Sequence, residues 1–285
     1  MNYVFFGTPR FAELVLHELI AAGMPPAAVV CNPDRPVGRR RIMTPPQVKQ
    51  LAERNGIRVL QPEKLDTAFE QELAALRPDF FVVAAYAKII PQSVLDIARL
   101  GTLGTHPSLL PKYRGASPIQ SVLLNGEART GATIYLMDAK MDHGPILAQD
   151  ELAIRGNETY LELEGSLAQQ AGRLLAKTIP PFFAGTLEPR PQNESDATFT
   201  KKFTTENGFV PEHDLAAAES GDAALAERID RMIRALDPEP GAWTTREGKR
   251  IKLLAARNEN GTLRLTRIQR EGEKPKDAPG GIVAL

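Results

Sequence analysis

Cysteine is nearly absent from this sequence, which has only Cys31 in 285 residues. A disulfide needs two thiols and a thiolate metal cluster needs several, so one chain can form neither. Low cysteine content is typical of proteins in a reducing compartment. We therefore expect a cytoplasmic protein that binds no metal.

The sequence also lacks net charge and long apolar runs. Its 35 Lys and Arg residues balance 35 Asp and Glu residues, so any surface for nucleic acid must be local. The first residues, MNYVFFGTPRF, contain no basic region followed by a long apolar run, and no later window reaches the roughly 18 apolar residues of a membrane span. We expect a soluble monomer without a membrane partner, long enough for two domains.

Short apolar segments alternate with helical patterns over the first 180 residues. Thr8 follows a strand expected at residues 3–6 and should cap the next helix, while Pro180 and Pro181 should end a helix expected at 159–179. Further strands are expected at 27–31, 58–60, 80–86 and 133–137, and further helices at 46–55 and 68–76. This alternation predicts an α/β fold, with a mostly parallel sheet, helices on both faces and a ligand crevice at the carboxyl ends of the strands.

The composition changes after residue 185. Residues 186–200, TLEPRPQNESDATFT, are polar and contain prolines, which is typical of a linker. Beyond them, a helical pattern at 222–236 precedes short β-rich runs separated by Glu-Gly and Asn-Gly turns. We predict a catalytic domain at 1–188, a linker at 189–205 and a small C-terminal β domain at 206–285.

Charge in the C-terminal domain is sorted along the chain. Residues 206–239 contain nine acids and three bases, whereas residues 246–276 contain ten bases and four acids. The basic stretch is either a solvated β surface or a face for a phosphate backbone. A second basic cluster, RPVGRRR at 35–41, is either an ordinary surface loop or a site of anion recognition, and its place beside the predicted crevice favours the second.

Two candidate catalytic residues follow predicted strands, namely His106 and Asp142. A carboxylate beside an imidazole favours the charged ring, and a charged donor can stabilise the oxyanion that develops on a carbonyl under attack. The pair therefore suggests acyl transfer. His17 lies within a predicted helix, His213 lies in a polar stretch, and His143 could crowd or tune the site. The sequence has no GxSxG elbow and no reactive cysteine, which favours direct transfer from a bound donor.

Several motifs resemble a known family. HPSLLPKYRGASPIQ at 106–120, TGATIYLMD at 130–138 and MDHGPIL at 141–147 resemble the signature of the formyltransferases that use 10-formyltetrahydrofolate. Six further motifs resemble the branch that acts on methionyl-tRNA: GTPRFA at 7–12, DRPVGRRR at 34–41, AYAKIIP at 85–91, PQNESDATFTKK at 191–202, IRALDPEPGAW at 233–243 and IQREGEKP at 268–275. The resemblance thus extends over nearly the whole chain.

The resemblance implies a fold and an activity. The fold is a Rossmann-like catalytic domain followed by a C-terminal β-barrel (OB-like) with a basic surface that faces tRNA. The activity is transfer of a formyl group from 10-formyltetrahydrofolate to the α-amino group of methionine on initiator methionyl-tRNA, for translation initiation. His106 and Asp142 match the catalytic residues. Gly104 stands where the family has asparagine, so the side-chain donor expected beside the formyl oxygen is missing.

The resemblance also implies two binding sites. The folate pocket would be lined by four consecutive residues, Ser108, Leu109, Leu110 and Pro111, and its pterin walled by Tyr86, Ile89 and Ile90. The acceptor stem of the tRNA would meet the arginines of the first basic cluster, which are Arg35, Arg39, Arg40 and Arg41.

Two alternatives remain open. An amino-sugar nucleotide N-formyltransferase would share the folate motifs, but the RPVGRRR and IRALDPEPGAW motifs argue against it. A non-catalytic RNA-binding relative with a degenerate site would explain Gly104, but the presence of His106, Asp142 and the SLLP segment argues against decay.

Overall fold

The computed structural model describes residues 1–38 and 41–278. It forms two compact units, of which the first comprises Met1–Arg114, Thr130–Leu152 and Glu164–Phe199, and the second comprises Gly115–Arg129, Ala153–Leu163 and Thr200–Leu285. The domain bounds at residues 188 and 206 stay a prediction. No helix in the described part of the chain is both long and apolar enough to span a membrane.

The first unit is built on a seven-stranded sheet with the order β10-β9-β7-β6-β1-β2-β5. β1, β2, β5, β6 and β7 are parallel, and β9 is antiparallel to β7. The strands of the sheet are β1 (Tyr3–Gly7), β2 (Ala28–Val30), β5 (Arg58–Leu60), β6 (Phe80–Ala84), β7 (Thr102–His106), β9 (Arg129–Leu136) and β10 (Ile146–Ala153). The predicted mostly parallel α/β fold is confirmed.

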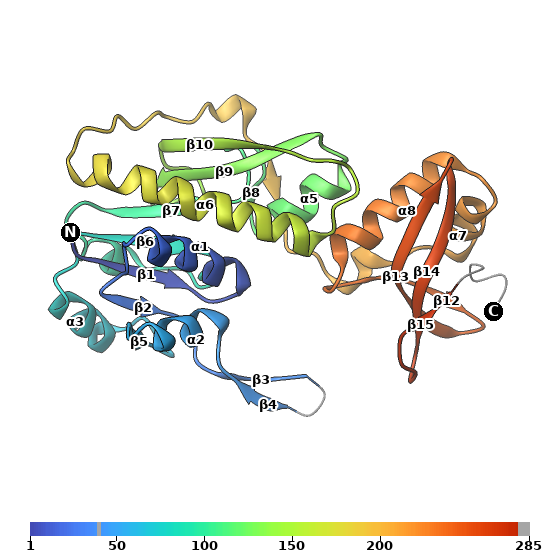
Figure 1. Ribbon diagram of the computed structural model, residues 1–285, viewed down its shortest axis with the longest axis horizontal. Coiled ribbons are helices and arrows are strands. Elements are labelled where there is room, and N and C mark those ends of the chain that lie inside the picture. The colour runs from blue at the N-terminus through green and yellow to red at the C-terminus, as the bar shows by residue number, and fades with distance from the viewer. Residues whose placement is uncertain (39–40, 279–285) are drawn as a thin grey trace. The chain divides into compact units, whose positions relative to one another are not determined.

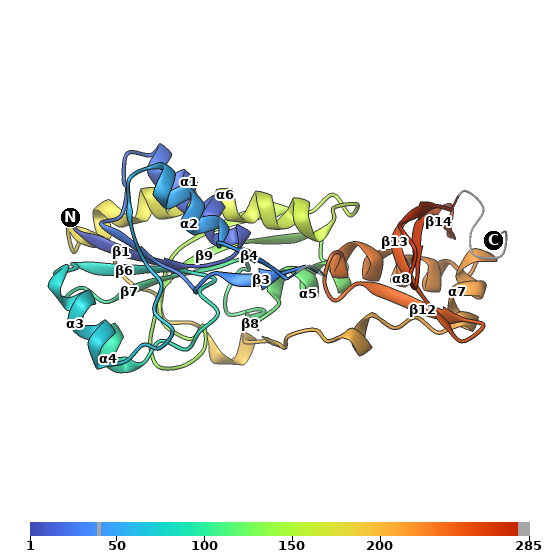
Figure 2. The ribbon, with the colours of Figure 1, turned by 90° about the horizontal axis from the view of Figure 1, so that it is seen from below.

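Helices cover both faces of this sheet, as Figure 2 shows for α1, α2 and α6 on one side and α3 and α4 on the other. Their bounds are α1 (Arg10–Ala21), α2 (Gln47–Arg54), α3 (Thr67–Ala75), α4 (Gln92–Leu95) and α6 (Tyr160–Phe183). The central strands β1 and β6 are therefore apolar on both faces. Tyr3 and Phe80 pair directly across these two strands and stack with ring centroids 5.1 Å apart, which aligns the register.

Two expectations about helix ends in this unit were wrong. The Thr8 hydroxyl does not cap α1, because it accepts a hydrogen bond from the backbone N–H of Asn32 on the neighbouring loop. Helix α6 does not end before Pro180 but continues through both prolines to Phe183. The prolines remove donors only in the last turns, where the carbonyls of Pro180 and Pro181 still accept from Ala184 and Thr186.

Smaller elements occupy the loops. β3 (Arg35–Val37) and β4 (Ile42–Thr44) form an antiparallel hairpin that extends away from the sheet in Figure 1. β8 (Arg114–Gly115) pairs with β11 (Phe199–Thr200), and a 3₁₀ turn (Glu194–Asp196) precedes β11. The segment expected as a linker thus contains short regular elements.

The second unit contains a four-stranded antiparallel sheet with the order β12-β13-β14-β15. Its elements are α5 (Pro118–Leu124), a 3₁₀ turn (Thr205–Gly208), α7 (Glu212–Glu219), α8 (Ala223–Leu236), β12 (Ala242–Arg246), β13 (Lys249–Glu259), β14 (Thr262–Arg270) and β15 (Lys276–Asp277). Asp222 caps α8 by accepting from the N–H groups of Ala224 and Leu225.

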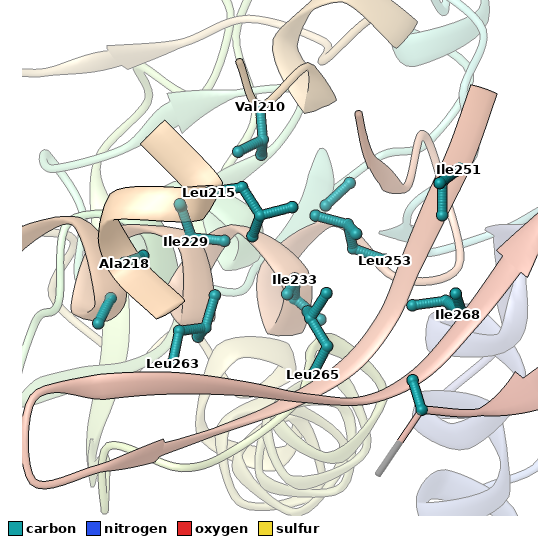
Figure 3. Close-up of a cluster of buried hydrophobic side chains, with 13 residues drawn as sticks. Val210, Leu215, Ala218, Ile229, Ile233, Ile251, Leu253, Leu263, Leu265 and Ile268 are labelled. Carbon is teal, nitrogen blue, oxygen red and sulfur yellow. The ribbon is translucent and has the colours of Figure 1, made fainter. Parts of the chain in front are cut away.

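The core of the second unit lies between α8 and one face of its sheet (Figure 3). Ile229 and Ile233 of α8 are buried with the inward side chains of β13 and β14, which are Ile251, Leu253, Leu263, Leu265 and Ile268. Strand alternation leaves Lys252, Arg264 and Arg267 exposed. The sorted charges of the sequence thus correspond to acidic helices and a sheet with basic side chains on its exposed face.

Candidate active site

His106 is the last residue of β7, at the carboxyl end of a parallel strand. Its ring is buried, and Nε2 lies 2.8 Å from the carbonyl oxygen of Tyr113. A carbonyl oxygen can only accept, so Nε2 carries the proton in this contact. Nδ1 faces Oδ2 of Asp142 at 3.7 Å. The structure therefore brings the two predicted catalytic side chains together and leaves one ring nitrogen directed at the carboxylate.

The backbone is strained at the two residues that contact this ring. Tyr113 has a φ of 61° and Asp142 a φ of 50°, both in the left-handed region. This conformation costs about 1 kcal/mol or more for a residue with a side chain. These two residues carry the carbonyl and the carboxylate that face the His106 ring.

Asp142 is held at both its side chain and its main chain, in the loop between β9 and β10. The Tyr135 hydroxyl donates to Oδ1 of Asp142 at 2.8 Å. The Gln192 amide donates to the carbonyl oxygens of Asp142 and Gly144 at 2.9 and 2.8 Å. The carboxylate therefore has a defined position although the loop is irregular.

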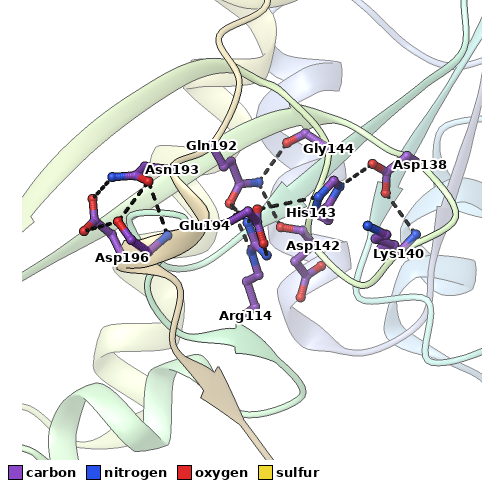
Figure 4. A network of polar contacts seen from close by, with 11 residues as sticks. Arg114, Asp138, Lys140, Asp142, His143, Gly144, Gln192, Asn193, Glu194 and Asp196 are labelled. Carbon is purple, nitrogen blue, oxygen red and sulfur yellow. Dashed lines mark hydrogen bonds and ion pairs between the residues drawn. The ribbon is translucent and has the colours of Figure 1, made fainter.

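A network around Arg114 fixes Gln192 in turn (Figure 4). Arg114 is 2% exposed and donates to Oε1 of Gln192 at 2.8 and 3.1 Å. It also donates to both carboxylate oxygens of Glu194, at 3.0 and 2.7 Å. These bonds keep the pKa of the Glu194 carboxyl below its usual value. Arg114 thus holds the 192–194 segment, and Gln192 of this segment joins it to the Asp142 loop.

His143 belongs to this network. Its Nδ1 lies 2.6 Å from Oδ2 of Asp138, and its Nε2 lies 3.5 Å from Oε1 of Glu194. Both ring nitrogens thus face carboxylates other than that of Asp142. We therefore assign His143 to the support of the loop.

Gly104 lies two residues before His106 on β7 and is buried. Its direct partner across the antiparallel pair is Tyr135 of β9. A Cβ atom at position 104 would lie 2.5 Å from two carbon atoms of the Tyr135 ring. The space beside Gly104 is therefore already filled.

The SLLP segment follows His106 and is fixed by hydrogen bonds. Ser108 is fully buried, and its hydroxyl donates to the carbonyl of Lys112 at 2.6 Å. The Thr133 hydroxyl donates to the Ser108 carbonyl and accepts from the N–H of Leu110. Leu110 packs with Tyr135 and Ile146, whereas Leu109 and Pro111 are partly exposed.

The other predicted pocket residues follow β6 at the same sheet edge. Tyr86 packs in the core with its ring 5.4 Å from that of Phe6, and its buried hydroxyl has no hydrogen-bond partner among the described residues. Burial raises the pKa of Tyr86 to about 12. Ile90 packs partly against the same core, whereas Ile89 is 94% exposed. These three side chains therefore lie in very different environments.

The predicted tRNA contacts are only partly described. Arg39 and Arg40 lie outside the described residues. Arg35 lies on β3, with a 62% exposed side chain and an ion pair to Glu63 at 2.8 Å. Arg41 is exposed beside the equally exposed Ile42 and Met43 of β4. The hairpin thus presents both charged and apolar side chains to the solvent.

Comparison with known proteins identifies the family of this chain. Residues 1–179 match the formyl transferase family, and residues 223–283 match the formyl transferase C-terminal domain. The chain belongs to the formyl transferase family. This formyl transferase is 40% identical, over its whole length and 83% of the relative, to a methionyl-tRNA formyltransferase of Halalkalibacterium halodurans. It is 44% identical, over 90% of its length and 77% of the relative, to that of Roseiflexus sp. (strain RS-1).

Solved structures share the fold of this formyl transferase at lower identity. Methionyl-tRNA formyltransferase from Clostridium thermocellum aligns over 98% of this chain and 100% of its own, with 18% identity and a TM-score of 0.59. An N-formyltransferase from Helicobacter canadensis, in complex with folinic acid and dTDP-3-aminofucose, aligns over 91% and 89%, with 19% identity and a TM-score of 0.64. At such identities these matches show the fold alone.

The sequence pattern indicated His106 and Asp142 but not the groups that orient them. Tyr113, Arg114, Tyr135 and Gln192 all lie within the motifs that carry the family resemblance. The motifs were therefore a signal that these residues matter, but nothing in their spacing showed that Gln192 contacts the Asp142 loop.

Proposed function

We propose that this chain transfers a formyl group from 10-formyltetrahydrofolate to the α-amino group of methionine on initiator methionyl-tRNA, for translation initiation in the cytoplasm. The observation that carries the proposal is the buried His106 ring, anchored through Nε2 and directed through Nδ1 at Asp142. The named relatives at 40–44% identity are methionyl-tRNA formyltransferases, which supports this acceptor.

The proposed reaction uses His106 as an electrostatic group and Asp142 as its partner. The neutral amine attacks the formyl carbon, a carbon–nitrogen bond forms, and the formyl oxygen takes the negative charge. The positive charge of the His106 ring stabilises this oxygen. Asp142 balances the charge of the ring and accepts the amine's proton through water. The C=O bond then re-forms as the carbon–nitrogen bond to N10 of the folate breaks, and Asp142 passes the proton of the amine to N10 through water.

The folate co-substrate would lie along the segment that follows His106. Leu109, Leu110 and Pro111 supply apolar contacts beside the reacting group, and the hydrogen bonds of Ser108 hold their backbone in place. Tyr86, Ile89 and Ile90 would contact the pterin. The Helicobacter canadensis relative was solved with folinic acid, which supports a folate-type donor for this fold.

The tRNA would meet two basic surfaces, one in each unit. Arg35, Arg39, Arg40 and Arg41 would contact phosphates of the acceptor stem. The outward face of β13 and β14 supplies a second surface with Lys252, Arg257, Arg264 and Arg267. Arg257 and Arg264 are direct cross-strand partners, and like charges in this position favour a bound anion.

We propose that residues 1–188 catalyse the transfer, that residues 206–285 contact the tRNA and that residues 189–205 are a linker. We also propose that the enzyme is a monomer and uses no metal.

A formylation assay with purified protein, 10-formyltetrahydrofolate and initiator methionyl-tRNA tests this proposal. We expect turnover by the wild type and a loss of about 100-fold or more in His106→Ala. His17→Ala is the matched control, because its side chain is exposed on α1 and has no proposed role. dTDP-3-aminofucose serves as the competing acceptor. Faster transfer to the amino sugar, or folate binding without transfer to either acceptor, would overturn the proposal in favour of one of its alternatives.

A further inference from the structure

The glycine at position 104 and the tyrosine at position 135 fit each other. They are direct partners in the antiparallel pair of β7 and β9, and both are buried. A Cβ atom at 104 would lie 2.5 Å from Cε1 and Cζ of Tyr135 and 2.9 Å from its hydroxyl oxygen. Real Cβ atoms essentially never approach another atom this closely. The aromatic ring therefore occupies the volume that a side chain at 104 would need.

The hydroxyl of this ring is directed at the candidate active site. It donates to Oδ1 of Asp142 at 2.8 Å, while Oδ2 of the same carboxylate faces Nδ1 of His106 at 3.7 Å. The two carboxylate oxygens thus have separate partners. A rotation of the carboxylate away from His106 would break the bond to Tyr135.

We infer that Tyr135 is a positioning residue for formyl transfer, and that Gly104, which has no side chain, leaves the space that the Tyr135 ring requires. Tyr135 fixes the orientation of the Asp142 carboxylate. It thereby fixes the position of the negative charge that faces His106. The inference rests on the proposed function, because the orientation of Asp142 matters for catalysis only if Asp142 takes part in the transfer.

Two properties of the Tyr135 environment support this role. The residue is 4% exposed, so water does not compete freely for its hydroxyl. Burial, followed by the nearby carboxylates of Asp142 and Asp138, raises the pKa of Tyr135 well above its usual value, so the hydroxyl remains a donor. Tyr135 also packs with Leu110 and Ile146, which places it against the segment proposed to bind folate.

The first experiment removes the hydroxyl and keeps the ring. We expect Tyr135→Phe to lower kcat about 10- to 100-fold in the formylation assay, with less than a threefold change in KM for either substrate, because a misplaced catalytic group slows the step itself. Tyr3→Phe is the matched control, since Tyr3 is also buried and donates to a backbone carbonyl, that of Met24, outside the site. It should keep wild-type kcat.

The second experiment tests whether Tyr135 acts through Asp142. Single-turnover rates are measured for Tyr135→Phe, Asp142→Asn and the double variant. If the hydroxyl works only by orienting the carboxylate, its removal has less than a threefold effect in the Asp142→Asn background. A purely structural contribution would lower the rate by the same factor in both backgrounds.

The third experiment tests the fit between the two positions without an activity readout. We expect Gly104→Ala to lower Tm by roughly 2 to 10 °C. The double variant with Gly104→Ala and Tyr135→Leu should lower Tm by less than the sum of the decreases in the two single variants. Gly165→Ala is the control, because its Cβ would meet only the Arg10 side chain at 3.4 Å or more. Gly104→Asn meets the same ring and should lower Tm at least as much as Gly104→Ala while Tyr135 is present.

The outcomes separate this inference from the proposed function. A wild type that transfers no formyl group overturns the proposed function, and the positioning role falls with it. An active wild type whose Tyr135→Phe variant keeps kcat within twofold overturns the inference alone and makes Tyr135 an ordinary core residue. Equal rate losses in both Asp142 backgrounds, or an unchanged Tm in Gly104→Ala, also contradict it.

Discussion

The Asp142 loop and the β3–β4 hairpin both carry charged side chains, but they hold them in opposite ways. Asp142 is bound by Tyr135 at its carboxylate and by Gln192 at its main chain, and its side chain is 16% exposed. Arg35 on the hairpin has a 62% exposed side chain and an exposed partner, Glu63. One region fixes a single charge, whereas the other presents several charges to the solvent.

This difference matches two different tasks. A charge that stabilises a transition state must be in place before the reaction, in surroundings where water does not screen it. Charges that attract a phosphate backbone act together, and salt screens them. Substitutions in the Asp142 loop should therefore change kcat, and substitutions in the hairpin should change the affinity for tRNA.

The largest effect is expected for Asp142→Asn, which keeps the shape of the side chain and removes its charge. We expect kcat for formylation to fall about 100- to 1000-fold, because the ring of His106 loses its charged partner. Steady-state kinetics give kcat, and thermal unfolding should show a nearly unchanged Tm. A kcat within tenfold of the wild type would contradict the role of Asp142.

The next effect is expected for Arg114→Met, which breaks the support of the same loop. Removal of this buried guanidinium leaves the Gln192 oxygen without its donors, at a cost of about 1–3 kcal/mol in stability. We expect a lower Tm and a kcat reduced about tenfold, because the Asp142 loop loses its anchor. Arg173→Met is the control, since Arg173 is 56% exposed on α6. Equal Tm and kcat in both variants would exclude the anchoring role.

A smaller effect, on binding rather than on kcat, is expected for Arg35→Ala combined with Arg41→Ala. We expect KM for methionyl-tRNA to rise about fivefold. The slope of log affinity against log salt concentration should become smaller in magnitude by about 2, because each arginine contributes one phosphate contact. Arg99→Ala is the control, because Arg99 is similarly exposed and also has a carboxylate partner, Asp79. A fall in kcat with unchanged KM would contradict the prediction that the hairpin acts in tRNA binding and the Asp142 loop in catalysis.

The smallest effect is expected for Glu194→Gln and depends on pH. Hydrogen bonds from Arg114 lower the pKa of Glu194 in the folded state. The stability that the charged carboxyl contributes is therefore present above its ordinary pKa and is lost as pH falls through the lowered value. Wild type and variant should differ in Tm by no more than about 3 °C at pH 7, because Glu194 is largely exposed. The two Tm values should converge once the pH falls below the lowered pKa of Glu194. A difference that grows in acid would contradict this assignment.

The position of His106 could be predicted because the carboxyl ends of parallel strands form one edge of a sheet. Asp142 follows β9, which runs antiparallel to β7, so this rule does not place it. The MDHGPIL motif indicated Asp142 instead. Pro36 and Gly38 placed the arginines of residues 35–41 in a loop, and the structure adds the β3–β4 hairpin. Continuous apolar runs identified β1 and β6, since buried strands need apolar residues on both faces.

The supporting contacts could not be predicted because they join distant parts of the chain. Gln192 follows Asp142 by 50 residues, and Arg114 precedes Glu194 by 80. Such pairs depend on where the 190–196 segment meets β10, at Ile146, which local patterns do not encode. The pairing of Gly104 with Tyr135 likewise depends on the register of β7 and β9, and a one-residue shift would separate them.

The fit between Gly104 and Tyr135 also couples the substitutions that the two positions tolerate. In its present place the Tyr135 ring overlaps with the Cβ atom of any side chain at 104. A change at one position therefore alters the cost of a change at the other. We expect selection to act on the pair rather than on each position independently.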